Sequence, residues 1–102
     1  MGGDVFRVTT GLLKVIPYLQ GSTELASHAL PEIAKLLTDQ DETVVLEASK
    51  ILHELSKKEP SCRALVANVT VVSMLIQAMA ATASAEIQKS LAGTMHNLSN
   101  DQ

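Results

Sequence analysis

The segment LHELS at residues 52–56 recurs as MHNLS at residues 95–99, and this pair of segments decides the fold. The offset of 43 residues between them also aligns apolar positions far outside the two segments. The aligned pairs are Ile33 with Ile76, Leu36 with Met79, Val44 with Ile87, Leu52 with Met95, His53 with His96, Leu55 with Leu98 and Ser56 with Ser99. A period of roughly 40 to 47 residues is typical of stacked helical units, each of which buries its apolar face only against a neighbour.

Within each unit the apolar residues follow a helical spacing. In the first unit, residues 41–57 place one apolar face at Val44, Val45, Ala48, Ile51, Leu52 and Leu55. The second unit repeats this face at Ile87, Leu91, Met95 and Leu98. Asp39, followed three residues later by Glu42, predicts a capping box at the start of the first long helix. Pro60 predicts its end.

Each unit is expected to contain a short, a medium and a long helix. The first unit predicts helices at 23–29, at 31–37 with Pro31 in the first turn, and at 41–57. The second predicts helices at 61–67, 70–81 and 84–99. Three helices per unit is the armadillo arrangement, whereas a HEAT unit has two. The sequence therefore predicts an all-α, armadillo-type right-handed α-solenoid fragment, with an N-terminal helix at 5–21 and repeats at 22–60 and 61–102. Residues 1–4 are expected to be a cloning remnant or a disordered start.

Composition excludes several classes of function. The chain has 102 residues, a formal charge of -3 and only two aromatic side chains, so it lacks the basic surface and stacking platform of a direct nucleic-acid binder. No apolar run reaches the roughly 18 residues that a membrane-spanning helix needs, so we expect no membrane insertion. Cys62 is the single cysteine, which rules out an intrachain disulfide and favours an intracellular protein.

Catalytic and metal-binding patterns are missing from the sequence. There is no Gly-rich phosphate loop, no serine elbow and no carboxylate pair in a catalytic context. His28, His53 and His96 do not have the spacing of metal ligands, and the repeat equivalence of His53 and His96 favours a packing role. We therefore expect no enzyme, no metal and no cofactor.

Three segments resemble a known family. ALPEIAKLLTDQDETVV (29–45), HELSKKE (53–59) and GTMHNLS (93–99) resemble the first two armadillo repeats of the beta-catenin and plakoglobin family. The likeness runs from about Tyr18 to Ser99. It implies a non-enzymatic scaffold that links cadherin complexes to alpha-catenin and actin at adherens junctions, and that serves as a transcriptional coactivator in Wnt signalling in the nucleus. Cadherin tails and T-cell-factor-type transcription factors would bind later repeats.

The resemblance implies an alpha-catenin-binding edge in the N-terminal helix. The matching residues are Val8, Leu12, Val15, Ile16, Tyr18, Leu19 and Leu25. The stripe that most of them form needs a cover, and this is either a partner helix or the first repeat, onto which the helix would fold back as a cap. Tyr18 matches a family tyrosine whose phosphorylation would add charge to an apolar interface. Pro17 departs from the vertebrate pattern and predicts a bend or an end of the helix.

A second surface implied by the resemblance is a groove for the helix of a Legless-type coactivator. The matching residues are Glu32, Ile33, Leu36, Asp39, Asp41, Val44, Ala48 and Leu55. An apolar groove rimmed by carboxylates suits an amphipathic helix with basic flanks. The alternative is that these aliphatic residues are simply core and that the two aspartates form a solvated, helix-capping turn.

Two other functions compete within the same architecture. A nuclear-import adaptor grips basic peptides with a ladder of tryptophans and asparagines, and this chain has no tryptophan. A purely structural fragment would only cap a longer array. Two repeats are fewer than the roughly three that stability usually requires. We therefore expect a piece that self-associates or is marginally stable, with Leu75, Met79 and Met95 partly uncovered at its open end.

Overall fold

The structure, a computed structural model, describes residues 14–100, and these form helices joined by short turns. Residues 14–20 are helical, and α2 (Thr23–Lys35) leads into the short 3-10 helix η1 (Leu36–Thr38). The remaining helices are α3 (Glu42–Ser56), α4 (Glu59–Ala67), α5 (Val69–Ala81) and α6 (Ala85–Asn100). No strand occurs within residues 14–100, so the predicted all-α fold is confirmed.

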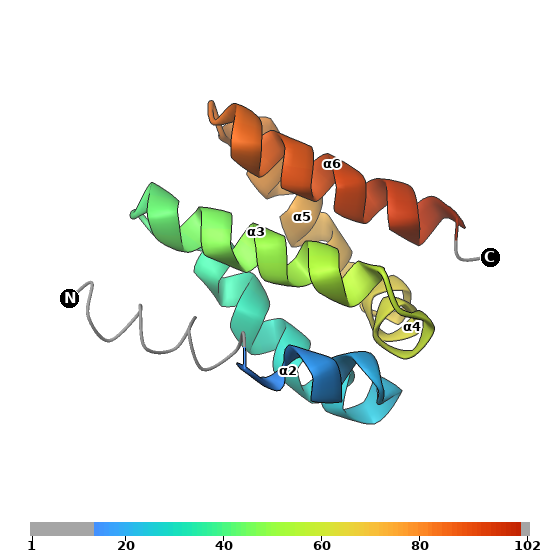
Figure 1. Cartoon of the computed structure of the whole chain (residues 1–102). Helices are drawn as coiled ribbons and strands as arrows, with labels where there is room; N and C mark the ends of the chain where they lie inside the picture. The colour runs from blue at the N-terminus through green and yellow to red at the C-terminus, as the bar shows by residue number, and fades with distance from the viewer. Residues whose placement is uncertain (1–13, 101–102) are drawn as a thin grey trace.

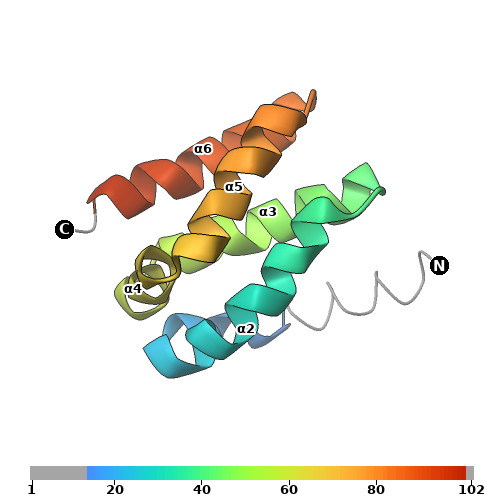
Figure 2. The ribbon, with the colours of Figure 1, turned by 180° about the vertical axis from the view of Figure 1, so that it is seen from behind.

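The helices form two layers (Figures 1 and 2). α3 and α6 run side by side in one layer, and their packing is the most extensive between any two elements of the described chain. α2 and α5 lie in the other layer, and α4 packs against α2 at one end of the molecule. The long helix α3 thus has its counterpart 43 residues later in α6, whereas α2 and η1 of the first half correspond to two separate helices, α4 and α5, in the second.

Short polar side chains cap the starts of four described helices. Their oxygens accept hydrogen bonds from backbone N–H groups that lack a partner within the helix. These caps are Ser22 to Leu25 at 3.2 Å, Asp41 to Thr43 at 2.9 Å, Asn68 to Val71 at 3.1 Å and Ser84 to Ile87 at 3.3 Å. Each cap fixes the residue at which the following helix begins.

The predicted capping box of Asp39 and Glu42 is wrong, because Asp41 is the cap of α3. The Asp39 carboxylate instead accepts a hydrogen bond from the Asp41 N–H at 2.8 Å. Asp39 and Asp41 are both suited to cap a helix by residue type. The turn selects Asp41 as the cap, with Asp39 holding the backbone N–H two residues further on. Pro60 does not directly follow α3 either; it lies in the first turn of α4, where its missing N–H costs nothing.

Pro31 does not separate two helices, contrary to the prediction. α2 continues through it, with Ala26, Leu30, Ile33 and Ala34 all buried along one face. An internal proline costs about 3 kcal/mol, whereas full burial of each Leu or Ile side chain contributes about 1.5 to 3 kcal/mol. A continuous buried face therefore outweighs the proline. In the second repeat the equivalent helices α4 and α5 are separate and meet at 88°. The helical segment 14–20 likewise continues past Pro17.

Aliphatic side chains build the core. The largest fully buried residues include Leu30, Ile33, Ile51, Leu52, Leu55, Leu65, Leu75, Ile87 and Leu91. The prediction for Leu75 is therefore wrong, since α6 and the first repeat cover it, while Met79 and Met95 are half-buried as expected. Within residues 14–100 no single helix combines the length and the apolar composition needed to cross a membrane. α4 and α5 have the required length and apolar composition only when taken together, and they are sharply bent against each other.

Candidate protein-interaction surfaces

The helical segment 14–20 has two apolar faces. Ile16 and Leu19 are buried in the same core cluster as the residues of α2 and α3. Gln20 Nε2 donates a hydrogen bond to the backbone oxygen of Glu54 at 2.6 Å, which ties the segment to the last turn of α3. The other face leaves Val15 at 38% and Tyr18 at 71% exposed. The segment therefore covers the first repeat while it still presents apolar surface to solvent.

Some residues of the predicted alpha-catenin edge are thus exposed and others are buried. Val15, Tyr18 and Leu25 are exposed, with half of the Leu25 surface open, and we call these three residues the N-terminal patch. Ile16 and Leu19 are reachable only if the segment leaves the core. Val8 and Leu12 lie outside the described residues.

The predicted coactivator groove is also divided. Ile33, Ala48 and Leu55 have no exposed surface, Val44 is buried and Leu36 is half-buried. Most of the aliphatic members therefore belong to the core.

The polar members of this groove remain accessible. Glu32 and Asp41 are exposed and Asp39 is half-buried. Glu32 forms an exposed ion pair with Lys35 at 3.2 Å, and Asp41 caps α3. The accessible part of the predicted groove therefore consists of Leu36 and the carboxylates, without a continuous apolar trough.

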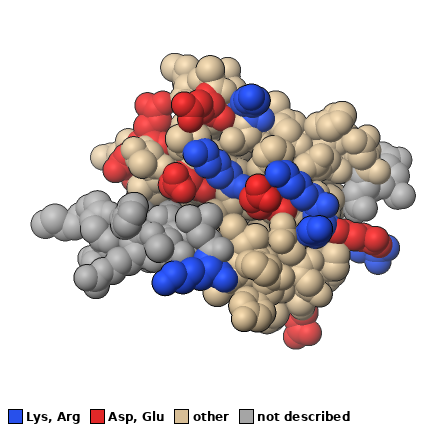
Figure 3. All heavy atoms as spheres, in the orientation of Figure 1, with Lys and Arg blue, Asp and Glu red and all other residues tan. Residues whose placement is uncertain are grey.

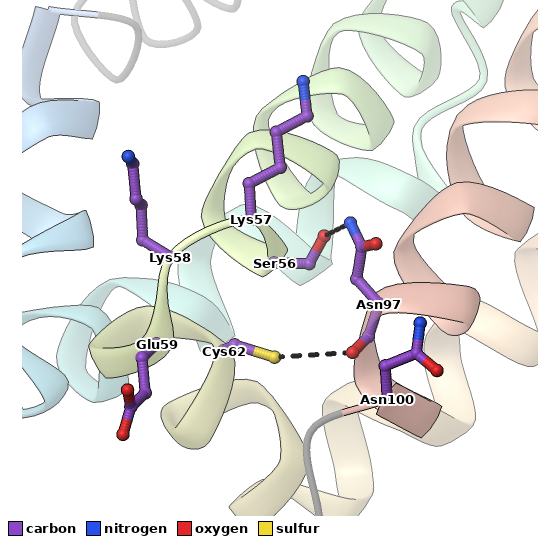
Figure 4. A pocket seen from close by; sticks show the side chains of 7 residues that line it. All are labelled: Ser56, Lys57, Lys58, Glu59, Cys62, Asn97 and Asn100. Atoms are coloured by element: carbon purple, nitrogen blue, oxygen red, sulfur yellow. Dashed lines mark hydrogen bonds between the residues drawn. The ribbon is translucent and has the colours of Figure 1, made fainter.

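A polar hollow of about 360 Å³ lies where α3, α4 and α6 meet (Figure 4). Asn97 Nδ2 donates to Ser56 Oγ at 2.9 Å, and Ser56 Oγ donates to the His53 backbone oxygen at 2.6 Å. The Cys62 thiol contacts the Asn97 backbone oxygen at 3.9 Å. Lys57 and Lys58 extend away from these contacts (Figure 4). The hollow therefore contains a polar junction between the two repeats.

Sequence reasoning missed this junction, although the repeated serine of LHELS and MHNLS was its signal. Ser56 is buried, and so is Ser61, whose hydroxyl donates to the backbone oxygen of Leu55. Within residues 14–100 no buried side-chain nitrogen or oxygen lacks a hydrogen-bond partner. Since buried polar groups are costly when unpaired, these bonds specify how α4 and α6 sit on α3.

Gly93 of α6 lies close against the His53 side chain of α3. A Cβ atom at Gly93 would stand 2.6 Å from His53 Nε2. This distance is too short for two non-bonded heavy atoms, so the glycine makes room for the imidazole. A lone glycine inside an apolar helical pattern was the available signal, because it costs about 1 kcal/mol relative to alanine unless packing requires it.

The stability of the chain should depend on the protonation of His53. Burial lowers the pKa of His53 below 6.5, Lys57 lowers it further, and Glu54 opposes both. The folded state therefore disfavours the imidazolium. The contribution to stability is fully present above pH 6.5 and is lost as the pH falls through the lowered folded pKa. Urea unfolding at pH 8 and pH 5 measures this effect: the wild type should lose more stability than His53→Gln. Equal losses in the two proteins would contradict it.

No group of three or more His, Cys, Asp or Glu side chains within residues 14–100 is arranged to hold a metal ion.

Comparison with known proteins places the chain in a family. No family model matches it. It is 43% identical over 81 residues to Catenin beta of Urechis caupo, and 42% identical over 81 residues to the Armadillo segment polarity protein of Drosophila melanogaster. Catenin beta of Tripneustes gratilla is 43% identical over the same length. Each match covers 79% of this chain and 10% of the relative, so the chain spans about a tenth of the length of the curated relatives it matches. Two stacked helical repeats and these identities show that the chain belongs to the beta-catenin and Armadillo family.

Proposed function

We propose that this chain forms the N-terminal edge of a non-enzymatic scaffold that joins cadherin complexes to alpha-catenin at adherens junctions and acts as a coactivator in Wnt signalling. The observation that carries the proposal is the N-terminal patch: Val15 and Tyr18 stay exposed on the helical segment 14–20, which already covers the core, and Leu25 is exposed at the start of α2. Cadherin tails and T-cell-factor-type factors would bind other repeats of the longer protein. The scaffold would work at the cytoplasmic face of junctions and in the nucleus.

Alpha-catenin would bind first through the N-terminal patch. Tyr18 offers an exposed aromatic side chain without any change in the fold, and tyrosine is enriched among the residues that dominate binding energy at protein interfaces. Leu25 adds an exposed aliphatic side chain. If the helical segment 14–20 leaves the core, Ile16 and Leu19 join them and enlarge the apolar face. The energetic cost of that step is the loss of their burial and of the bond from Gln20 to Glu54. Capping and partner binding would then alternate on one helix.

Replacement of Tyr18 by glutamate should weaken alpha-catenin binding by about tenfold. It removes an exposed ring and places a carboxylate in an apolar interface, as phosphorylation of the same residue would. Calorimetry with a purified alpha-catenin head domain measures the effect. Tyr18→Phe keeps the ring and should bind like the wild type. Gln88→Glu adds one charge at an exposed position of α6 and should also leave the affinity unchanged. An unchanged affinity of Tyr18→Glu would rule out this edge.

A Legless-type coactivator helix would bind along α2 and α3 beside the carboxylates Glu32, Asp39 and Asp41. The half-buried Leu36 supplies apolar contact there. The basic flanks of such a helix would be oriented by the rim, which acts mainly on the rate of association. Displacement of the helical segment 14–20 would be one route to a deeper groove, since that segment packs into the same core cluster as Ile33, Ala48 and Leu55.

Asp39→Lys should slow association of a synthetic Legless-type helix by about threefold to tenfold at low salt, with the difference shrinking as salt screens the rim. Stopped-flow fluorescence at several salt concentrations measures this rate. Asp39→Asn is the control for the turn, because its side-chain oxygen can still accept the hydrogen bond from the Asp41 N–H. An on-rate that is indifferent to Asp39→Lys would remove this surface from the proposal.

A further inference from the structure

A groove between the two repeats lies at the end of the molecule where α3 and α6 begin. Two adjoining hollows of about 280 and 370 Å³ make up this inter-repeat groove, and they share Leu37, Asp39, Ala78 and Ala81. The floor also includes the buried side chains of Val45 and Ile87. α5 lines both hollows with the small side chains of Ala78 and Ala81, and it adds Met74 and Gln77 to the second hollow. The space above the two alanines can take a larger apolar side chain.

The rim of the groove is acidic. Asp39 and Glu42 are the only charged side chains that line either hollow, and neither forms an ion pair with any residue of 14–100. One Asp39 oxygen is held by the Asp41 N–H, which fixes the carboxylate at the edge. In Figure 3 carboxylates gather over the part of the surface where α3 and α6 begin. The rim thus places two carboxylates, one of them held by a backbone N–H, beside an apolar floor.

We propose that the inter-repeat groove binds a short segment of another protein in which a leucine-sized side chain is flanked by arginine or lysine. The apolar side chain occupies the space above Ala78 and Ala81, and the cations lie against Asp39 and Glu42. Burial of one or two such side chains with exposed ion pairs supports a dissociation constant on the order of 0.1 to 1 mM. A second copy of this chain is disfavoured as the occupant, because its net charge is -3.

This groove is separate from the surfaces under the proposed function. It shares only Asp39 with the coactivator surface, and on α3 it uses Val45 instead of Val44. It also requires α5 and α6, so it exists only when the second repeat is packed on the first. Glu42 belongs to this groove alone, which makes it the residue of choice for a test.

The probe is the peptide acetyl-Ala-Arg-Leu-Leu-Arg-Ala-amide, added to the isotope-labelled chain of 102 residues and followed by two-dimensional NMR. The expected result is a saturable shift of the Leu37, Ala78 and Ala81 amides. A peptide with glutamates in place of the arginines, and one with serines in place of the leucines, should each bind at least about fivefold more weakly. Shifts spread over other surfaces, equal binding of the acidic peptide, or self-association of the chain at this groove would overturn the proposal.

Substitutions in the groove complete the test. Glu42→Lys should weaken the arginine peptide by about fivefold or more, whereas Glu24→Lys should leave it unchanged. The pair is matched, because both glutamates are exposed and both lie in the first turn of a helix. Ala78→Met fills the groove and should abolish the shifts. If that variant loses its helical circular dichroism, Glu42→Gln decides instead. Equal weakening by Glu42→Lys and Glu24→Lys would contradict the assignment of the rim.

Discussion

Replacement of Leu91 by alanine should lower the free energy of unfolding by about 2 to 5 kcal/mol. Leu91 is fully buried on α6, the helix that packs most extensively against α3. Removal of its branched side chain leaves a cavity in the core that the surrounding helices close only partly. A domain of this size is stable by about 5 to 15 kcal/mol, so the loss is a large part of the total.

Urea unfolding followed by circular dichroism measures this loss, with Leu25→Ala as the control. Leu25 is half exposed, and its truncation should cost less than about 1 kcal/mol. Because α3 and α6 join the two repeats, the whole chain should still melt in a single transition shifted to lower urea. A cost below about 1 kcal/mol for Leu91→Ala, or the loss of one repeat alone, would show that the repeats are not held together by this interface.

The second large effect concerns Gly93→Ala, whose effect on the free energy of unfolding should change sign when His53 is replaced by alanine. Alanine at Gly93 gains about 1 kcal/mol of helix propensity and loses about 1 to 3 kcal/mol through the clash with His53. We therefore expect Gly93→Ala to be neutral or destabilising by up to about 2 kcal/mol in the wild type. In a His53→Ala background, where the imidazole is gone, it should stabilise the chain by about 1 kcal/mol.

A double-mutant cycle isolates this interaction, because the difference between the two backgrounds is the coupling between residues on adjacent repeats. We expect a coupling of about 1 to 3 kcal/mol. Leu25→Ala with Gly93→Ala is the control cycle and should show additivity, since Leu25 lies on α2 and Gly93 on α6, two helices that do not contact each other. If Gly93→Ala has the same effect with and without the imidazole, the close approach at His53 does not determine the packing of α6.

Leu91→Ala and Gly93→Ala both test how α6 packs on the first repeat: one removes a side chain there and the other adds one. Leu91 fills the space between the repeats, and Gly93 keeps a neighbouring part of the same helix free for a side chain of α3. His53 and His96 are equivalent in the repeat, yet His53 is half-buried and His96 is exposed. The difference follows from position, because only His53 has a following repeat within the described chain to pack against. Repeat-equivalent residues therefore need not share an environment.

The sequence by itself determined the repeat, the helical class and the apolar faces of the long helices. These properties are local: the 43-residue offset and the 3.6-residue spacing can be read from neighbouring letters, as LHELS and MHNLS illustrate. Helix ends were less well determined. Asp39 and Asp41 are both good caps by composition, and Pro31 reads as a helix start until the buried face that continues past it is known.

Tertiary structure alone decided which apolar residues are available to a partner. Helical spacing identifies which residues form an apolar face, but not how completely a neighbouring helix buries them. That burial depends on side chains about 40 residues away in the chain. For this reason Ile33, Ala48 and Leu55 are core residues, while Tyr18 and Leu25 remain exposed. The close approach of Gly93 to His53 and the groove between Leu37 and Ala78 have the same origin. Each requires two repeats packed against one another, and neither repeat contains it alone.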